Sequence, residues 1–123
     1  MRHIWVDVRI GSEDCSKITE VRVLVDTGAT LTIILRSLAI DLGLRVTGKS
    51  RVETGVGVIE LDRSRAYIEV MGRGDIIPVL ISDVIDKVLI GVTTLEIFEL
   101  EVDPITRRLR ERTLLLYLNT MNS

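Results

Sequence analysis

The chain is poor in the residues that mark several common protein classes. Of its 123 residues one is cysteine (Cys15), two are proline, and aromatic residues make up 3%. A single cysteine excludes an internal disulfide framework, and so few aromatic side chains leave Val, Ile and Leu to fill the core. Glutamine is absent and asparagine occurs only as Asn119 and Asn122. This scarcity of thermolabile amides favours a thermophilic source.

Charge and hydropathy exclude further classes. The net charge of −2 at pH 7 gives no electrostatic footprint for nucleic acid or for an anionic membrane. No apolar stretch approaches the length of a membrane span, and residues 1–7 carry charges where a secretory signal needs an apolar segment. His3 and Cys15 stand alone, without the spacing of metal ligands. We therefore expect one cytoplasmic domain over residues 1–123, with no metal, no cofactor, no nucleic-acid partner and no membrane partner.

Hydrophobic patterning predicts a mostly β chain. Apolar and polar residues alternate strictly from position 4 to position 10, which is typical of a half-buried strand. Further strands or strand-length apolar runs are expected at 17–25, 31–35, 76–81, 88–91, 99–102, 107–110 and 113–118. Short helices are expected at 36–43, ended by Gly43, and at 92–99, capped by Thr93 or Thr94.

A long hairpin is expected over residues 50–71. Glycines at 55 and 57 are expected to interrupt its first arm, residues 62–64 are a second turn candidate, and 72–75 form a clear turn. Pro78, in the strand that follows, predicts an edge or bulge position because proline cannot donate to a sheet ladder.

The segment 23–30, VLVDTGAT, occurs once and combines residues suited to acid–base chemistry. Its apolar run ends a buried strand and delivers Asp26 into a tight turn. There the Thr27 hydroxyl can bond to the backbone of a symmetry mate, and Gly28 can supply an N–H toward the carboxylate without crowding it. One carboxylate cannot serve as both general acid and general base toward an amide, so a second must come from another copy of the chain.

Two Asp26 side chains meeting at a two-fold axis would share one proton, because both cannot comfortably ionise. The ionised member could then take a proton from a water that attacks a peptide carbonyl. The protonated member could donate toward the carbonyl oxygen. The alternative is that Asp26-Thr27-Gly28 is only a strand-end turn, which arises by chance in roughly a few per cent of chains of this length.

The surroundings of the motif are more specific than the tripeptide. Residues 25–30, followed by Thr32-Ile33-Ile34 and by 38–44, resemble the retropepsin-like aspartic proteases, most closely their cellular archaeal and bacterial branch. A second block fits independently: VLIG at 88–91, TLE at 94–96 and LEVDP at 100–104. The resemblance covers about residues 4–110.

The resemblance implies a closed β-barrel subunit of the retropepsin type, with one or two short helices, that works as an obligate homodimer. Asp26 would be the catalytic aspartate, Thr27 would make inter-subunit hydroxyl bonds, and Gly28 would contact the substrate backbone. A flap would lie between residues 50 and 65. Its mobile tip would be at or near Gly55, Val56, Gly57 and Val58; the alternative for these glycines is an ordinary bulge.

The expected activity is an aspartic endopeptidase that hydrolyses an extended peptide or unfolded protein, bound by strand addition beneath the flaps. Candidate pocket walls are Ala29, Val56, Val58, Val79 and Ile90. One rival is a catalytically weak or inactive dimer of the same fold that serves as a peptide-binding or assembly module. Another is an unrelated β-barrel binding domain with an accidental motif.

The run Leu114-Leu115-Leu116-Tyr117-Leu118 is too apolar to lie free in water. It either completes the core of one subunit or pairs as a strand across a dimer interface. The family precedent of terminal strands that join the dimer favours the second interpretation for residues 113–118.

Overall fold

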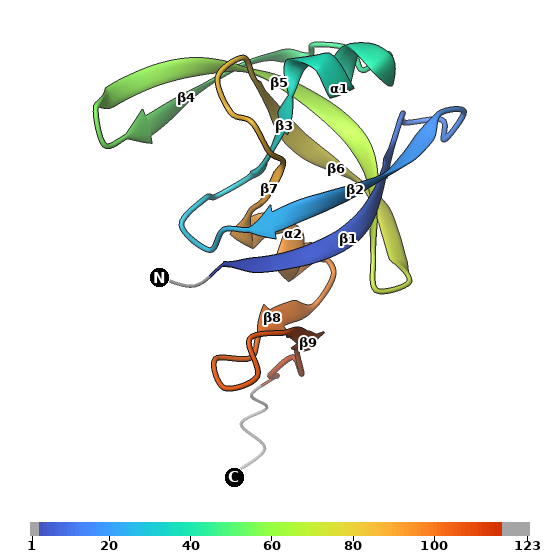
Figure 1. The fold of residues 1–123 in the computed structure, drawn as a ribbon, viewed down its shortest axis with the longest axis vertical. Coiled ribbons are helices and arrows are strands. Elements are labelled where there is room, and N and C mark those ends of the chain that lie inside the picture. The colour runs from blue at the N-terminus through green and yellow to red at the C-terminus, as the bar shows by residue number, and fades with distance from the viewer. Residues whose placement is uncertain (1–2, 117–123) are drawn as a thin grey trace, which may run out of the picture.

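The computed structural model describes residues 3–116, and its main feature is one strongly curved sheet (Figure 1). Its seven strands lie in the order β1-β2-β7-β3-β6-β5-β4. Strand β1 also pairs with β5, so the sheet closes on itself. The strand bounds are Ile4–Gly11 (β1), Ile18–Val25 (β2), Thr32–Leu35 (β3), Gly48–Thr54 (β4), Gly57–Val70 (β5), Arg73–Ser82 (β6) and Leu89–Ile90 (β7).

The first hairpin forms as the alternating pattern predicts. β1 and β2 are antiparallel, with Ile4 opposite Val25 and Gly11 opposite Ile18. Val8, Ile10, Val23 and Val25 are buried, because side chains on one face of a strand share the same side of the sheet. This hairpin carries the segment after Val25 to one end of the barrel.

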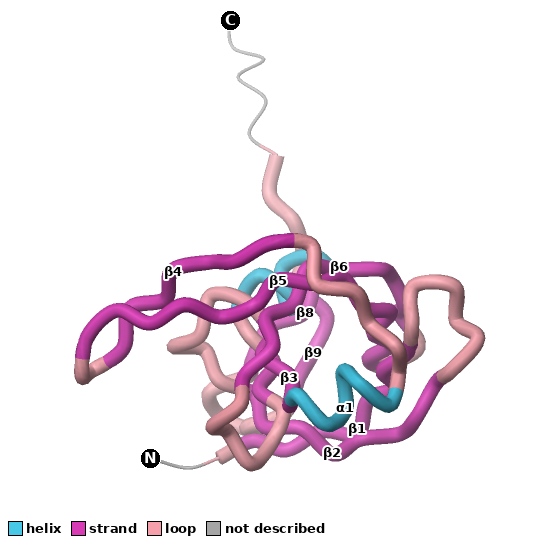
Figure 2. Tube along the Cα trace, turned by 90° about the horizontal axis from the view of Figure 1, so that it is seen from above, coloured by secondary structure: helices cyan, strands magenta, loops and turns pink. Residues whose placement is uncertain are grey.

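The second hairpin is longer and simpler than predicted. The turn between β4 and β5 is Gly55-Val56 itself, so the glycines do not interrupt the first arm. The turn predicted at 62–64 is wrong, because these residues lie inside β5 and pair with β6. Figure 2 shows this hairpin projecting sideways from the barrel.

The next turn is shorter than predicted. Residues 73–75 already belong to β6, and the reversal is made at Met71-Gly72, which both have positive φ. Pro78 lies one residue before β6 begins to pair with β3 at Val79. Its missing N–H therefore stands where β6 has a single neighbouring strand, β5.

The barrel interior is aliphatic. Phe98 is the one aromatic side chain among the buried hydrophobic residues that the structure describes. The fully buried residues include Val23, Ile34, Ile68, Val79 and Ile90, which come from five different strands. Parallel pairing of β2 with β7 and of β3 with β6 brings these distant segments together.

Two short helices cover the ends of the barrel. α1 (Arg36–Asp41) buries Ala39 and is shorter than the predicted 36–43; Gly43 follows it with a φ of +67° and donates its N–H to the carbonyl of Ile40. α2 (Val92–Ile97) begins after Gly91, with no side-chain cap. The prediction that Thr93 or Thr94 caps it is wrong, because Thr94 is buried in the helix and bonds elsewhere.

The carboxyl-terminal part forms a separate small ribbon. β8 (Leu100–Val102) pairs with β9 (Leu109–Glu111), which confirms the predicted last hairpin to within two residues. Residues 113–116 form no strand in the single chain, and 117 and 118 lie outside the described residues. Leu115 and Leu116 are 82% and 79% exposed.

Candidate active site

Asp26 stands at the start of the loop that joins β2 to β3. Its backbone N–H donates to the carbonyl of Ile90 at 2.9 Å, and its own carbonyl accepts the N–H of Ala29 at 3.1 Å. The N–H of Gly28 donates to Asp26 Oδ1 at 2.9 Å. The carboxylate of the half-buried Asp26 is therefore held by its own loop, and its backbone is held by the neighbouring strand β7.

Gly91 allows the β7–α2 segment to lie directly against this loop. A Cβ atom at position 91 would lie 2.5 Å from the carbonyl carbon and oxygen of Leu31 and 2.9 Å from the carbonyl oxygen of Ala29. The two segments are joined by hydrogen bonds from Val92 N–H to the Ala29 carbonyl (2.8 Å) and from Thr93 N–H to the Thr30 carbonyl (3.0 Å). The sequence block 88–91 thus acts as the scaffold of the Asp26 loop.

A buried pair of threonines, Thr32 and Thr94, also stabilises the contact between the Asp26 loop and the segment around Gly91. The Thr32 and Thr94 hydroxyl groups are 2.5 Å apart, and Thr32 Oγ1 accepts the N–H of Gly91 at 3.1 Å. Both side chains are almost completely buried. Their polar atoms satisfy one another and the Gly91 backbone, as buried polar groups must.

A groove of about 530 Å³ lies between this loop and the β4–β5 hairpin, which projects above it (Figure 1). Asp26 and Gly28 line one side of the groove, and β4 lines the other. The floor is made by Ile33, Leu80 and Leu89. These three residues are neighbours across β6, β3 and β7 in the sheet register, so their side chains share one face.

The predicted site residues lie in three places: in the groove, at the tip of the hairpin and on the exposed part of the Asp26 loop. Ala29 lines the groove with Asp26 and Gly28. Gly55, Val56, Gly57 and Val58 form the tip of the hairpin, where Val56 is 97% exposed and Gly57 has a φ of +128°. Val56 and Val58, expected as pocket walls, are not among the residues that line the groove. Thr27 is exposed in the loop beside Asp26.

Val79 and Ile90 differ from their expected place as pocket walls. Both are completely buried in the barrel core. Their neighbours Leu80 and Leu89 line the groove instead, because adjacent strand residues face opposite sides of the sheet. Further groove residues were missed, among them Val52 on β4 and Arg63 on β5. The strand register across the hairpin would have revealed them.

The base of the hairpin is held by a cluster of charged side chains. Asp62 accepts hydrogen bonds from Lys49 on β4 (3.0 Å) and lies 2.8 Å from Arg36 of α1, while Arg36 also reaches Asp83 at 2.9 Å. Hydrogen bonds from Lys49 and Arg36 lower the pKa of Asp62 below its ordinary value. The hydrogen bond from Arg36 likewise lowers the pKa of Asp83.

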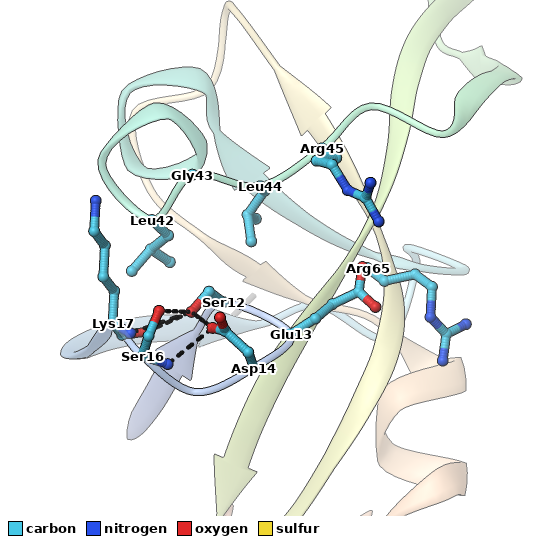
Figure 3. Close-up of a pocket in the computed structure, with 10 residues that line it drawn as sticks. All are labelled: Ser12, Glu13, Asp14, Ser16, Lys17, Leu42, Gly43, Leu44, Arg45 and Arg65. Carbon is cyan, nitrogen blue, oxygen red and sulfur yellow. Dashed lines mark hydrogen bonds between the residues drawn. The ribbon is translucent and has the colours of Figure 1, made fainter.

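A smaller hollow of about 430 Å³ lies away from Asp26, between the β1–β2 turn and the end of α1 (Figure 3). Asp14 accepts the Ser16 N–H and the Ser12 hydroxyl, each at 2.9 Å. Hydrogen bonds from Ser16 and Ser12 lower the pKa of Asp14 to about 2. The polar groups of this turn are thus satisfied within the turn itself.

No group of three or more His, Cys, Asp or Glu side chains within residues 3–116 is placed to hold a metal ion. Over the same range, neither helix is long and apolar enough to cross a membrane.

The chain matches the family model described as gag-polyprotein putative aspartyl protease over residues 17–97, which is more than half of its length. The chain belongs to this family. The matched range contains both the Asp26 loop and the segment around Gly91 that supports it. The retropepsin-like resemblance seen in the sequence is therefore confirmed.

Two solved protease structures share the fold. The EIAV protease in complex with the inhibitor HBY-793 matches with a TM-score of 0.63 and 22% sequence identity, over 77% of this chain and 86% of that one. The solution structure of the simian foamy virus (mac) protease matches with a TM-score of 0.54 and 20% identity, over 77% of this chain and 92% of that one. No curated protein sequence matches significantly. The predicted mostly β, retropepsin-like fold is confirmed by these likenesses.

Proposed function

We propose that this chain is an aspartic endopeptidase that works as a homodimer, with one Asp26 from each copy in the active site. The observation that carries the proposal is the Asp26 loop: a half-buried carboxylate, fixed by hydrogen bonds, on the wall of a groove. Membership of an aspartyl protease family supports the same reaction. A second copy is required because the family motif occurs once in the chain.

In the proposed reaction the two Asp26 carboxyl groups hold one proton between them. The ionised group takes a proton from a bound water as the water oxygen attacks the carbonyl carbon of the substrate. The protonated group donates its proton to the carbonyl oxygen, which gives a tetrahedral diol. Collapse of this intermediate breaks the C–N bond, and the leaving nitrogen takes up a proton from the pair, so that an acid and an amine are released.

The groove suits an extended peptide of apolar character near the scissile bond. Its floor offers Ile33, Leu80 and Leu89, and Val52 approaches from the hairpin. The β4–β5 hairpin would act as the flap, since its tip is exposed and turns on two residues, Gly55 and Val56. Backbone bonds to the flap and loop would hold the peptide as an added strand, and alternate side chains would enter the pockets.

The Asp26→Asn variant tests the proposal. We expect wild-type protein to cleave an unfolded protein or a peptide library between pH 3 and 8, fastest at acidic pH, and to be blocked by a hydroxyl-bearing mimic of the tetrahedral intermediate. The variant should lose activity by roughly 10⁴-fold, since both carboxyl groups of the proposed pair are replaced by amides that cannot exchange the proton. Asp41→Asn, which changes an exposed carboxyl group on α1, is the matched control and should remain active.

Each outcome has a defined meaning for the mechanism. Undiminished cleavage by the Asp26→Asn variant would remove Asp26 from the reaction. If the wild-type protein binds peptides but cleaves none of them, also at elevated temperature, the peptide-binding or assembly module is the better description.

A further inference from the structure

Arg63 stands on the groove face of the hairpin. It lies opposite Leu80 of β6 in the register, and Leu80 in turn lies beside Ile33 of β3. Arg63 therefore continues the row of side chains that forms the apolar floor, and it is among the residues that line the groove. Its backbone is fixed there, because its carbonyl accepts the Thr47 N–H at 2.8 Å.

The guanidinium of Arg63 is exposed and has no ion-pair partner among residues 3–116, unlike Arg36 and Arg73. Its partner across the hairpin is Gly48, which has no side chain to cover it or to bind it. A cation placed in this way beside an apolar floor is available to a ligand.

The other charges along the groove do not neutralise this position. Arg51 and Glu53 lie on β4 opposite Glu60 and Val58 of β5, on the face of the hairpin that turns away from Val52. They are exposed there, whereas Val52 is half-buried. Asp26 is the remaining charged side chain among the described residues that line the groove, and the proposed chemistry uses it.

We propose that Arg63 determines specificity, by binding an acidic side chain (Asp or Glu) of the peptide that occupies the groove. A planar guanidinium can make two parallel hydrogen bonds to a carboxylate, which selects this group by geometry as well as by charge. The inference rests on the proposed function in that it places a peptide in the groove. In a homodimer the acidic preference would occur once on each side of the scissile bond.

The test uses matched peptide pairs that differ only by Glu against Gln at one position, scanned along a fluorescent decapeptide. Cleavage rates (kcat/KM) are measured with the wild-type protein, and binding is measured by fluorescence anisotropy with the Asp26→Asn variant. At one or two positions we expect a preference for Glu of about three- to tenfold at pH 6. The preference should fall in high salt and vanish at pH 3.5, where the peptide carboxyl group becomes protonated.

Three variants make the test specific. Arg63→Gln should abolish the preference for Glu, and Arg63→Glu should replace it by a preference for Lys at the same position. Arg65→Gln is the matched control, because Arg65 lies two residues along β5 and lines the other hollow (Figure 3). It should keep the wild-type preference.

A preference that survives Arg63→Gln, or the absence of any preference at any position, overturns the proposal. If peptides with Glu bind better in an Arg63-dependent way but none is cleaved, the endopeptidase proposal fails and the specificity inference stands. If Glu and Gln peptides are cleaved at equal rates, the endopeptidase proposal stands and the specificity inference fails. If no peptide binds or is cleaved, both proposals fail.

Discussion

At Gly91 two segments of backbone approach more closely than a side chain permits. The position has extended φ, so glycine is required by contact and not by conformation. The sequence indicated an important glycine here only through its resemblance to a family. Close approach to Leu31, sixty residues earlier in the chain, cannot be inferred from local pattern. The same holds for the Thr32–Thr94 pair, since a threonine at the start of a helical segment resembles a cap.

We predict that Gly91→Ala destabilises the fold and displaces the Asp26 loop. The new methyl group would lie 2.5 Å from the Leu31 carbonyl, and the two backbone segments cannot easily separate because hydrogen bonds from Val92 and Thr93 join them. Such overpacking costs about 1–3 kcal/mol in the free energy of unfolding, and it should also lower any peptidase activity. Chemical denaturation, followed by circular dichroism, measures the cost.

Gly48→Ala is the control for this prediction. A Cβ atom at position 48 meets nothing within 4 Å, and its φ is not positive, so stability should stay within about 0.5 kcal/mol of wild type. Equal stability of the two variants would show that the Gly91 contact relaxes without cost.

Among the elements, the presence of a strand was easier to predict than which of its faces points into the core. The β1–β2 hairpin alternates between apolar and polar residues, so its inward face could be assigned from sequence. The run from Ile76 to Ile81 is apolar on both faces, because one face meets the core and the other forms the groove. A run that is apolar on both faces does not indicate which of its residues point into the core. That is why Val79 was placed in the pocket and its neighbour Leu80 was not.

The β4–β5 hairpin is joined to α1 through Asp62, which pairs with Lys49 of β4 and with Arg36 of α1. We predict that Asp62→Asn loosens its base and gives a severalfold increase in amide hydrogen exchange across β4. Because the folded-state pKa of Asp62 is lowered, this carboxylate stabilises the protein above its unfolded pKa of roughly 3.9 and ceases to do so as the pH falls through the lower folded value. The free energies of unfolding of the wild-type protein and the Asp62→Asn variant should therefore differ at pH 7 and become equal only well below pH 4.

Glu60→Gln is the matched control for this experiment. Glu60 lies two residues away on β5 and makes no ion pair within residues 3–116. If Glu60→Gln accelerates exchange as much as Asp62→Asn, net charge and not the Asp62 cluster governs the mobility of the hairpin.

At the scale of the whole molecule, the single chain presents half of a proposed active site together with apolar surface near its carboxyl terminus. Leu114, Leu115 and Leu116 are 59%, 82% and 79% exposed. Water-exposed leucines in succession are unfavourable, and burying each one is worth about 2 kcal/mol. We predict that residues 113–116, with the residues beyond them, pair with a second chain and stabilise the homodimer.

Removal of residues 113–123 should therefore raise the dimer dissociation constant by roughly a hundredfold or more, since several leucines per chain would lose their buried contacts. Analytical ultracentrifugation over a dilution series measures the change, and activity should fall in parallel because the proposed active site takes one Asp26 from each copy. The control is Ile105→Ser, which removes an apolar side chain that is 88% exposed in the β8–β9 turn. It should leave association unchanged. A truncated chain that remains dimeric at nanomolar concentration would assign the interface to another surface, and the terminal leucines would then have no part in assembly.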